Sequence, residues 1–149
     1  EFAPMTPHQA RVVAEARHWI GTPYVHQASC RGAGTDCLGL LRGLWRRLYG
    51  AEPAALPPYT PDWGEAGGQE LLLAAARVWL RPSAGAAPGD VLLFRMREGG
   101  IAKHLGIAAE IGAAPSFVHA YSGHGVVESP LSAPWARRVV ARFAFPEGV

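Results

Sequence analysis

The stretch GTDCLGL, residues 34–40, decides how the rest of the chain is interpreted. Apolar residues follow it three or four positions apart, which predicts an amphipathic helix over residues 36–49. Aspartate is a favoured N-cap residue, so Asp36 is expected to cap this helix and Cys37 to lie in its first turn.

The position of Cys37 favours a nucleophilic thiolate, because a helix start offers free N–H groups and a partial positive charge. The alternative is a buried structural cysteine, which is common for a lone cysteine. Position alone does not decide between them, since a reactive thiol also needs exposure and a base. Cys30, with no helix start behind it, is expected to be structural, and both cysteines are expected to be free thiols.

The expected elements change type along the chain. Thr6-Pro7 predicts the start of a first helix with an apolar stripe of Val12, Val13, Ala16, Trp19 and Ile20. Gly39 and Gly43 predict close packing against the second helix. A surface loop over 51–68 and a third helix over 69–80 precede strands at Val91–Met96, His104–Ile111, Ser116–Tyr121, Val126–Glu128 and Arg137–Phe145. This order predicts an α+β fold with helices packed on a mainly antiparallel sheet.

Composition excludes several classes of protein. The 149 residues fit one domain, 1–149, and 49% hydrophobic content is too high for a disordered chain. No apolar run approaches the about 18 residues of a membrane span. The net charge of +2 and scattered arginines give no reason to expect nucleic acid, and no metal-ligand spacing or cofactor motif appears. Residues 1–5 do not form a secretory signal, so synthesis in the cytoplasm without a signal peptide is expected.

Two histidines are candidates for the base that a catalytic thiol needs. His104 and His119 lie on strands separated by a turn near residues 112–115, so their imidazoles can share one face of a sheet. The alternative is that each is an ordinary hydrogen-bonded histidine on a half-buried strand. The remaining histidines are expected at the surface of the first helix or in loops: His8, His18, His26 and His124.

Five ordered blocks of sequence resemble the NlpC/P60 family of cell-wall cysteine peptidases, over about residues 6–145. The blocks are Gly21–Tyr24, Asp36-Cys37-x-Gly39, Pro88–Phe94, His104–Ile107 and Val118–Ala120. Residues 26–29 and 102–107 further resemble the subgroup encoded with phage tails and gene transfer agents.

The resemblance implies a papain-like core and a role for each matching residue. Cys37 would be the nucleophile, His104 the general base and acid, and His119 the polar third member. Tyr24 would assist the oxyanion or the substrate, and Asp36 would either cap the helix or meet a substrate amine. The family usually has serine where this chain has Leu38, which bears on substrate specificity and not on the chemistry.

The resemblance also implies a function. The enzyme would hydrolyse an amide bond of a peptidoglycan stem peptide, a D-γ-glutamyl bond to a diamino acid, without a metal or cofactor. It would be carried on a phage-like tail, with hub or baseplate proteins as partners, and would act in the periplasm or cell wall.

Other functions stay open at this point. A non-catalytic tail-tip or adaptor module could keep the fold with an unreactive cysteine. An amidase or acyltransferase could use the same residues, although the order of Cys before His disfavours the rearranged acyltransferases. A zinc hydrolase lacks its motif. The segment 51–85, which contains Trp63 and Glu65, has no readable function, and Trp63 and Trp135 could contact sugar or a partner, or pack in the core.

Overall fold

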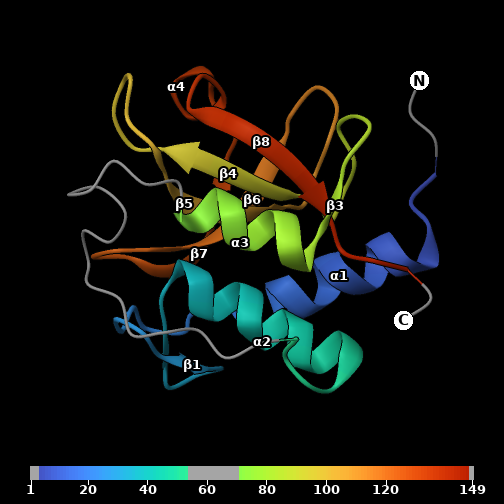
Figure 1. Ribbon diagram of the computed structural model, residues 1–149, viewed down its shortest axis with the longest axis vertical. Helices are drawn as coiled ribbons and strands as arrows, with labels where there is room; N and C mark the ends of the chain where they lie inside the picture. The colour runs from blue at the N-terminus through green and yellow to red at the C-terminus, as the bar shows by residue number, and fades with distance from the viewer. Residues whose placement is uncertain (1–3, 54–70, 148–149) are drawn as a thin grey trace.

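The computed structural model describes residues 4–53 and 71–147 (Figure 1). The expectations for the first residues of the third helix and for most of the 51–68 loop, with Trp63 and Glu65, lie outside the described residues.

Three of the four helices match sequence expectations. The first begins with a capping box, in which Thr6 Oγ1 accepts from the Gln9 amide and the Gln9 side chain accepts from the Thr6 amide. It ends before Ile20, which is exposed, so the predicted apolar stripe is wrong at that residue. The short last helix was not expected, because one turn has no periodicity. The helices are α1 (Pro7–Arg17), α2 (Cys37–Tyr49), α3 (Leu71–Trp79) and α4 (Ala133–Ala136).

The main sheet has six strands in the order β3-β8-β4-β5-β6-β7, and every neighbouring pair is antiparallel. A separate hairpin, β1–β2, lies in the loop before α2. The two-residue strands were not predicted, and the bounds of β5, β7 and β8 differ from expectation by a few residues. The strands are β1 (Ser29–Cys30), β2 (Gly34–Thr35), β3 (Arg81–Pro82), β4 (Val91–Arg95), β5 (Ala102–Ala108), β6 (Ser116–Tyr121), β7 (Gly125–Pro130) and β8 (Val139–Ala144).

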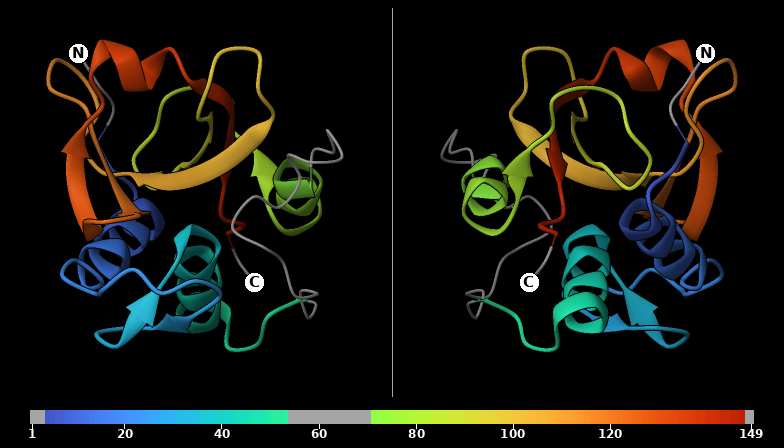
Figure 2. Two further views of the ribbon diagram at one scale, coloured as in Figure 1. Left: turned by 90° about the vertical axis from the view of Figure 1, so that its left-hand side faces the viewer. Right: turned by 90° about the vertical axis from the view of Figure 1, so that its right-hand side faces the viewer.

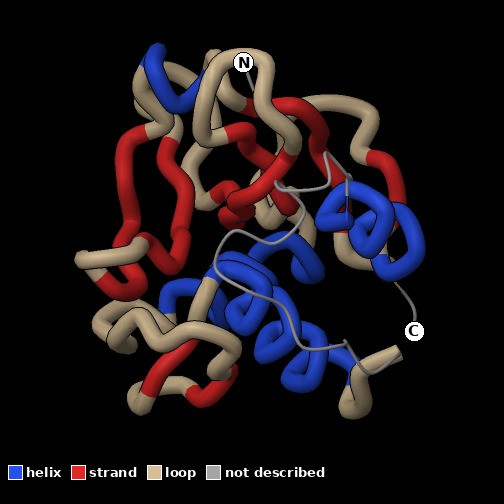
Figure 3. Tube along the Cα trace, turned by 60° about the vertical axis from the view of Figure 1, so that its left-hand side comes forward, coloured by secondary structure: helices blue, strands red, loops and turns tan. Residues whose placement is uncertain are grey.

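The sheet is covered on both faces. Helices α1 and α2 pack on one face, where alternate residues such as Leu93, Leu105 and Ile107 form the larger core with them (Figure 2). The other face buries Phe94 and Phe117 in a smaller cluster beneath the segment that contains α4. Figure 3 shows α4 on the far side of the strands from α1 and α2. The predicted α+β architecture is confirmed.

Close packing around α2 explains its glycines. A Cβ atom at Gly39 would overlap the carbonyl oxygen of Ala28, and one at Gly43 would overlap the Trp19 ring. The helix therefore approaches both the preceding loop and α1 more closely than an alanine would allow, as the sequence predicted.

The start of α2 faces a gap in the sheet. Strands β5 and β6 pair at Ile107–Val118 and Ala108–Phe117, and the ladder stops short of His104. Helix α2 contacts both strands. This arrangement places the first turn of α2 beside the ends of the two strands that carry the histidines.

Candidate active site

Cys37 is the first residue of α2, as predicted. Asp36 is the N-cap, and its Oδ1 accepts a hydrogen bond of 2.7 Å from the Gly39 amide. Cys37 is only 7% exposed. The helix start and the neighbouring strand β5 place Cys37 and His104 on the wall of the same pocket.

His104 and His119 lie on adjacent antiparallel strands and form a direct pair. His104 Nε2 is 2.8 Å from His119 Nδ1, and both rings are buried. The prediction that the two imidazoles share one face is confirmed. Because Nε2 is engaged by His119, Nδ1 is the ring nitrogen of His104 that remains for the thiol. Cys37 and His104 line the same pocket, of about 370 Å³.

Ser129 extends this pair into a chain of three side chains. Its Oγ is 2.9 Å from His119 Nε2. When His104 Nδ1 accepts a proton from the thiol, Nε2 carries hydrogen and donates to His119 Nδ1. His119 then carries its own hydrogen on Nε2 and donates to Ser129. The serine oxygen can therefore stabilise the tautomer of His119 that His104 would need in order to act as a base.

Sequence reasoning missed Ser129, because the strand expected at residues 126–128 ended one residue before it. The register of β6 and β7 shows why Ser129 faces His119. His119 pairs with Val127, and a side chain two positions away along β7 points to the same face of the sheet.

Burial controls the charge state of the site. It raises the pKa of the Cys37 thiol to about 12, with the Asp36 charge as the second cause, although three backbone N–H groups oppose the shift. Burial also lowers the pKa of His104 to about 3 and that of His119 to about 4. Burial therefore outweighs the partial positive charge of the helix start, and the thiol and both imidazoles are neutral at pH 7.

Asp36 holds two parts of the site together. Its second oxygen accepts a 2.7 Å hydrogen bond from the Gln27 amide, and His26 Nδ1 lies 3.8 Å from the same oxygen. Gln27 has a φ of 65°, in the left-handed region, so this contact fixes an unfavourable backbone conformation. Of the two roles expected for Asp36, helix capping is present.

Tyr24 also lines the pocket. Its pKa is raised to about 12, chiefly by burial and then by Cys37 and Asp36, so its hydroxyl keeps its proton at neutral pH. A protonated phenol is a hydrogen-bond donor, as an oxyanion requires. Leu38 is buried and also lines the pocket.

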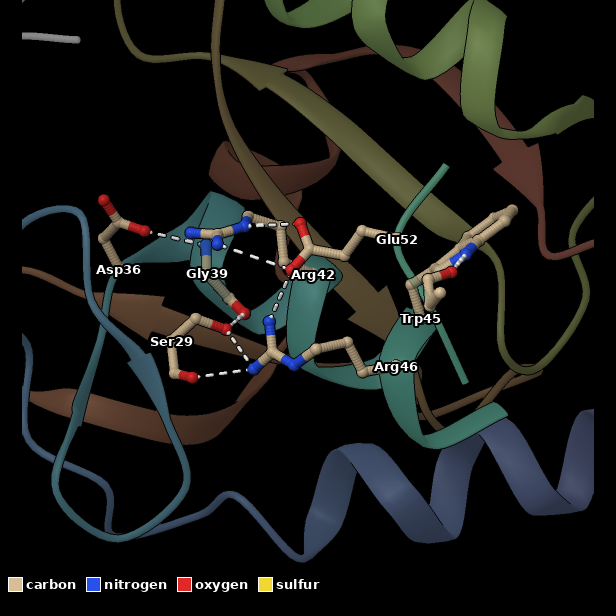
Figure 4. Close-up of polar contacts among 8 residues, drawn as sticks. Ser29, Asp36, Gly39, Arg42, Trp45, Arg46 and Glu52 are labelled. Atoms are coloured by element: carbon tan, nitrogen blue, oxygen red, sulfur yellow. Dashed lines mark hydrogen bonds and ion pairs between the residues drawn. The ribbon is translucent and has the colours of Figure 1, made fainter. Parts of the chain in front are cut away.

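A polar network fastens the loop before Cys37 to α2 (Figure 4). Ser29 Oγ donates to the Gly39 carbonyl at 2.6 Å, and Arg46 donates to both oxygens of Ser29. Glu52 in turn accepts from Arg46 and Arg42, each at 2.9 Å. The loop that carries Tyr24 and Gln27 is therefore attached to α2 through Arg46, in the last turn of the helix, as well as through Asp36 at its first turn.

Other predicted residues have different surroundings. Trp135 packs behind the histidines, with ring centroids 5.8 Å from His104 and 5.2 Å from His119, so it has a packing role. His8 was expected at the surface but is partly buried, because its Nε2 meets the Phe145 carbonyl at 3.0 Å. Cys30 was expected to be structural but is exposed, and both cysteines are free thiols.

Residues 4–53 and 71–147 contain neither a candidate metal-binding cluster nor a candidate membrane-spanning helix. No group of three His, Cys, Asp or Glu side chains in that part of the chain could hold a metal ion. None of the helices described there has the length and apolar character that a membrane crossing requires.

A cysteine at a helix start, beside a histidine pair on an antiparallel sheet, defines the thiol-hydrolase type of site. The chain belongs to the NlpC/P60 family, which matches residues 21–143. Members of this family are generally cysteine peptidases and peptidoglycan hydrolases.

Solved structures support the same assignment. The NlpC/P60 domain of the peptidoglycan hydrolase SagA is 25% identical, with a TM-score of 0.58, and the match covers 92% of this chain and 98% of that domain. A lipoprotein-like NLP/P60 protein of Staphylococcus aureus subsp. aureus Mu50 is 19% identical, with a TM-score of 0.60, over 98% of this chain and 44% of its own. An NlpC/P60 protein of Bacillus cereus ATCC 10987 is also 19% identical, with a TM-score of 0.62, and the match covers 94% of this chain and 41% of that protein.

This chain therefore spans less than half the length of the last two proteins, and their likeness concerns the fold. A comparison with curated proteins gave no match.

We expect the rings of His104 and His119 to stay neutral at pH 5. Burial lowers both pKa values, to about 3 and about 4, so the folded rings resist a proton that an unfolded histidine accepts below about pH 6.5. Acidification from pH 7 to pH 5 therefore destabilises the fold through these two groups. Long-range ¹H–¹⁵N spectra of the imidazole nitrogens between pH 8 and pH 5 measure the charge state directly.

In the variant His119→Asn, the imidazole signals of His119 disappear from the spectrum, which identifies them in the spectrum of the wild type. A titration midpoint near pH 6.5 for either buried ring would contradict the prediction.

Proposed function

We propose that this chain is a cysteine peptidase that hydrolyses amide bonds in peptidoglycan stem peptides. The observation that supports this most is that Cys37 and His104 line one pocket, and that His104 contacts His119, which contacts Ser129. Family membership supports the class of bond, and the structural neighbour SagA is described as a peptidoglycan hydrolase.

The proposed reaction begins from the neutral pair. The Cys37 sulfur attacks the amide carbonyl carbon while its proton passes to His104 Nδ1. The resulting oxyanion accepts hydrogen bonds from the Cys37 amide and the Tyr24 hydroxyl. His104 then gives this proton to the amine as the C–N bond breaks, which leaves a thioester on Cys37.

Water completes the cycle. His104 Nδ1 takes a proton from a water molecule as its oxygen attacks the thioester carbonyl. The C–S bond breaks, the acid product leaves, and the proton returns to the Cys37 sulfur. Throughout, His119 accepts the Nε2 hydrogen of His104, which keeps the ring oriented and stabilises its transient positive charge.

The bond that we propose is the D-γ-glutamyl amide to a diamino acid, on the strength of the five sequence blocks. Leu38 departs from the family serine at the pocket wall, where it is 3% exposed. It removes a hydroxyl from the substrate side of the site while leaving the attacking group, the base and the oxyanion donors in place.

Digestion of purified diamino-acid-type peptidoglycan tests the proposal. The wild type should release muropeptides with new peptide ends, and Cys37→Ala should release none, because no other thiol lines the pocket. Mass spectrometry of the products identifies the bond. The matched control is Cys30→Ala, which removes the exposed thiol and should retain full activity.

Full activity in Cys37→Ala would overturn the mechanism. If well-folded wild-type protein releases no products, the result would favour a binding module that keeps the fold without catalysing the reaction.

Ser129→Ala should lower kcat about tenfold with little change in KM, because losing one hydrogen bond destabilises the working tautomer of His119. Ser129→Thr keeps the hydroxyl and should restore most of the rate. The control is Ser132→Ala, since Ser132 makes no side-chain cap hydrogen bond. Equal losses in the alanine and threonine variants would show that Ser129 acts only through packing.

We also propose that the enzyme is made in the cytoplasm and carried on a phage-like tail to the periplasm or cell wall, bound to hub or baseplate proteins. The support is the resemblance of residues 26–29 and 102–107 to the tail-associated subgroup. Quantitative proteomics of purified tail particles from the source cells, with cross-linking, should find this chain linked to a hub protein. Its absence from intact particles would refute the carriage.

A further inference from the structure

Arginines gather in a hollow on the face of the sheet away from α1 and α2. The hollow has a volume of about 410 Å³ and lies between the end of β4 with its following turn and the segment around α4. It is lined by Arg95, Arg97, Glu98, Pro134, Arg137 and Arg138.

The charge of this hollow is concentrated. Four arginines against one glutamate leave an excess of three positive charges, which is larger than the net charge of +2 of the whole chain. The hollow therefore carries a local positive charge that favours the binding of anions.

Three of these arginines lack an acidic partner among the described residues. Elsewhere in that part of the chain, Arg17, Arg42 and Arg142 form ion pairs of 2.9 to 3.1 Å with glutamate or aspartate. Arg95, Arg137 and Arg138 form no side-chain hydrogen bond or ion pair with any described residue. Their N–H groups remain for a ligand from outside.

The backbone beneath the arginines is fixed. The Arg95 amide donates to the Arg138 carbonyl at 2.9 Å, which joins β4 to the segment after α4. The Arg138 guanidinium lies over the Trp135 ring, 5.6 Å from its centroid. A held guanidinium loses less entropy on binding an anion than a free one.

The hollow and the catalytic pocket share one structural unit. Met96 and Lys103, at the ends of the β4–β5 turn, line the catalytic pocket, whereas Arg95, Arg97 and Glu98 line the hollow. A polymer whose peptide occupies the pocket therefore lies close to the arginines on the same turn.

We propose that this hollow binds free carboxylates of the peptidoglycan stem peptides and holds the polymer beside the catalytic pocket. The inference rests on the proposed function, because it takes the substrate from there. Planar guanidinium groups fit carboxylates through paired hydrogen bonds, and stem peptides carry such carboxylates repeatedly along the polymer.

Binding is measured with the Cys37→Ala protein and insoluble peptidoglycan, so that cleavage does not interfere. Adding Arg95→Gln, Arg137→Gln and Arg138→Gln should weaken binding about tenfold or more. The matched control adds Arg31→Gln, Arg77→Gln and Arg81→Gln, three exposed arginines away from the hollow with the same change in net charge, and should bind almost as the parent does. Thermal unfolding of both fourfold variants checks that the fold is retained.

Chemical treatment of the polymer identifies the anion. Amidation of its carboxylates should reduce parent binding to the level of the Arg95/Arg137/Arg138 variant, whereas removal of phosphate polymers with hydrogen fluoride should leave it unchanged. Unaltered binding by that variant overturns the proposal, as does an equal loss in the control. Loss after phosphate removal, or arginine-dependent binding to DNA alone, also overturns it.

The test is independent of catalysis. Arginine-dependent binding without any Cys37-dependent cleavage by the wild type would remove the proposed function and leave the carboxylate surface. Cys37-dependent cleavage without arginine-dependent binding would support the proposed function and overturn the proposed carboxylate-binding hollow.

Discussion

The carboxylate of Asp36 is the constraint on which the site depends. One oxygen closes the first turn of α2 through Gly39, and the other holds the Gln27 amide in a loop with unfavourable backbone geometry. Because Asp36 directly precedes Cys37 and is 2% exposed, one buried side chain fixes the Cys37 backbone and one wall of the pocket together. Loss of the carboxylate would leave two N–H donors without their partner.

The sheet supplies the histidines of the site, at the place where the pairing of β5 and β6 is interrupted. Where the β5–β6 ladder stops, His104 and Cys37 line the same pocket. A continuous ladder would close this space. The histidine pair spans the same two strands, so its 2.8 Å contact joins them beyond the last paired residues. The candidate site therefore lies where the hydrogen-bonded pairing of β5 and β6 ends.

Local patterns predicted what local physics determines. The capping box at Thr6, the cap at Asp36 and the strand containing His119 follow from short-range rules, and so they match the structure. The two-residue strands and the single turn of α4 are set by tertiary contacts and leave no period in the sequence. Finding Ser129 required the register between β6 and β7, which the sequence does not show. Predicting the raised pKa of Cys37 required knowing that the residue is buried, which its place at a helix start does not reveal.

The burial that suppresses charge at rest also makes the site selective for the reacting state. A lone thiolate or a lone imidazolium is disfavoured in this pocket, as the opposite pKa shifts of Cys37 and His104 show. In the proposed reaction, proton transfer during attack creates both charged partners at once, and the negative charge passes to the substrate oxygen. There the Cys37 amide would donate to this oxygen, while His119 and Ser129 would stabilise the positive charge on His104. Because these groups are already oriented, they stabilise charge that the resting site does not carry.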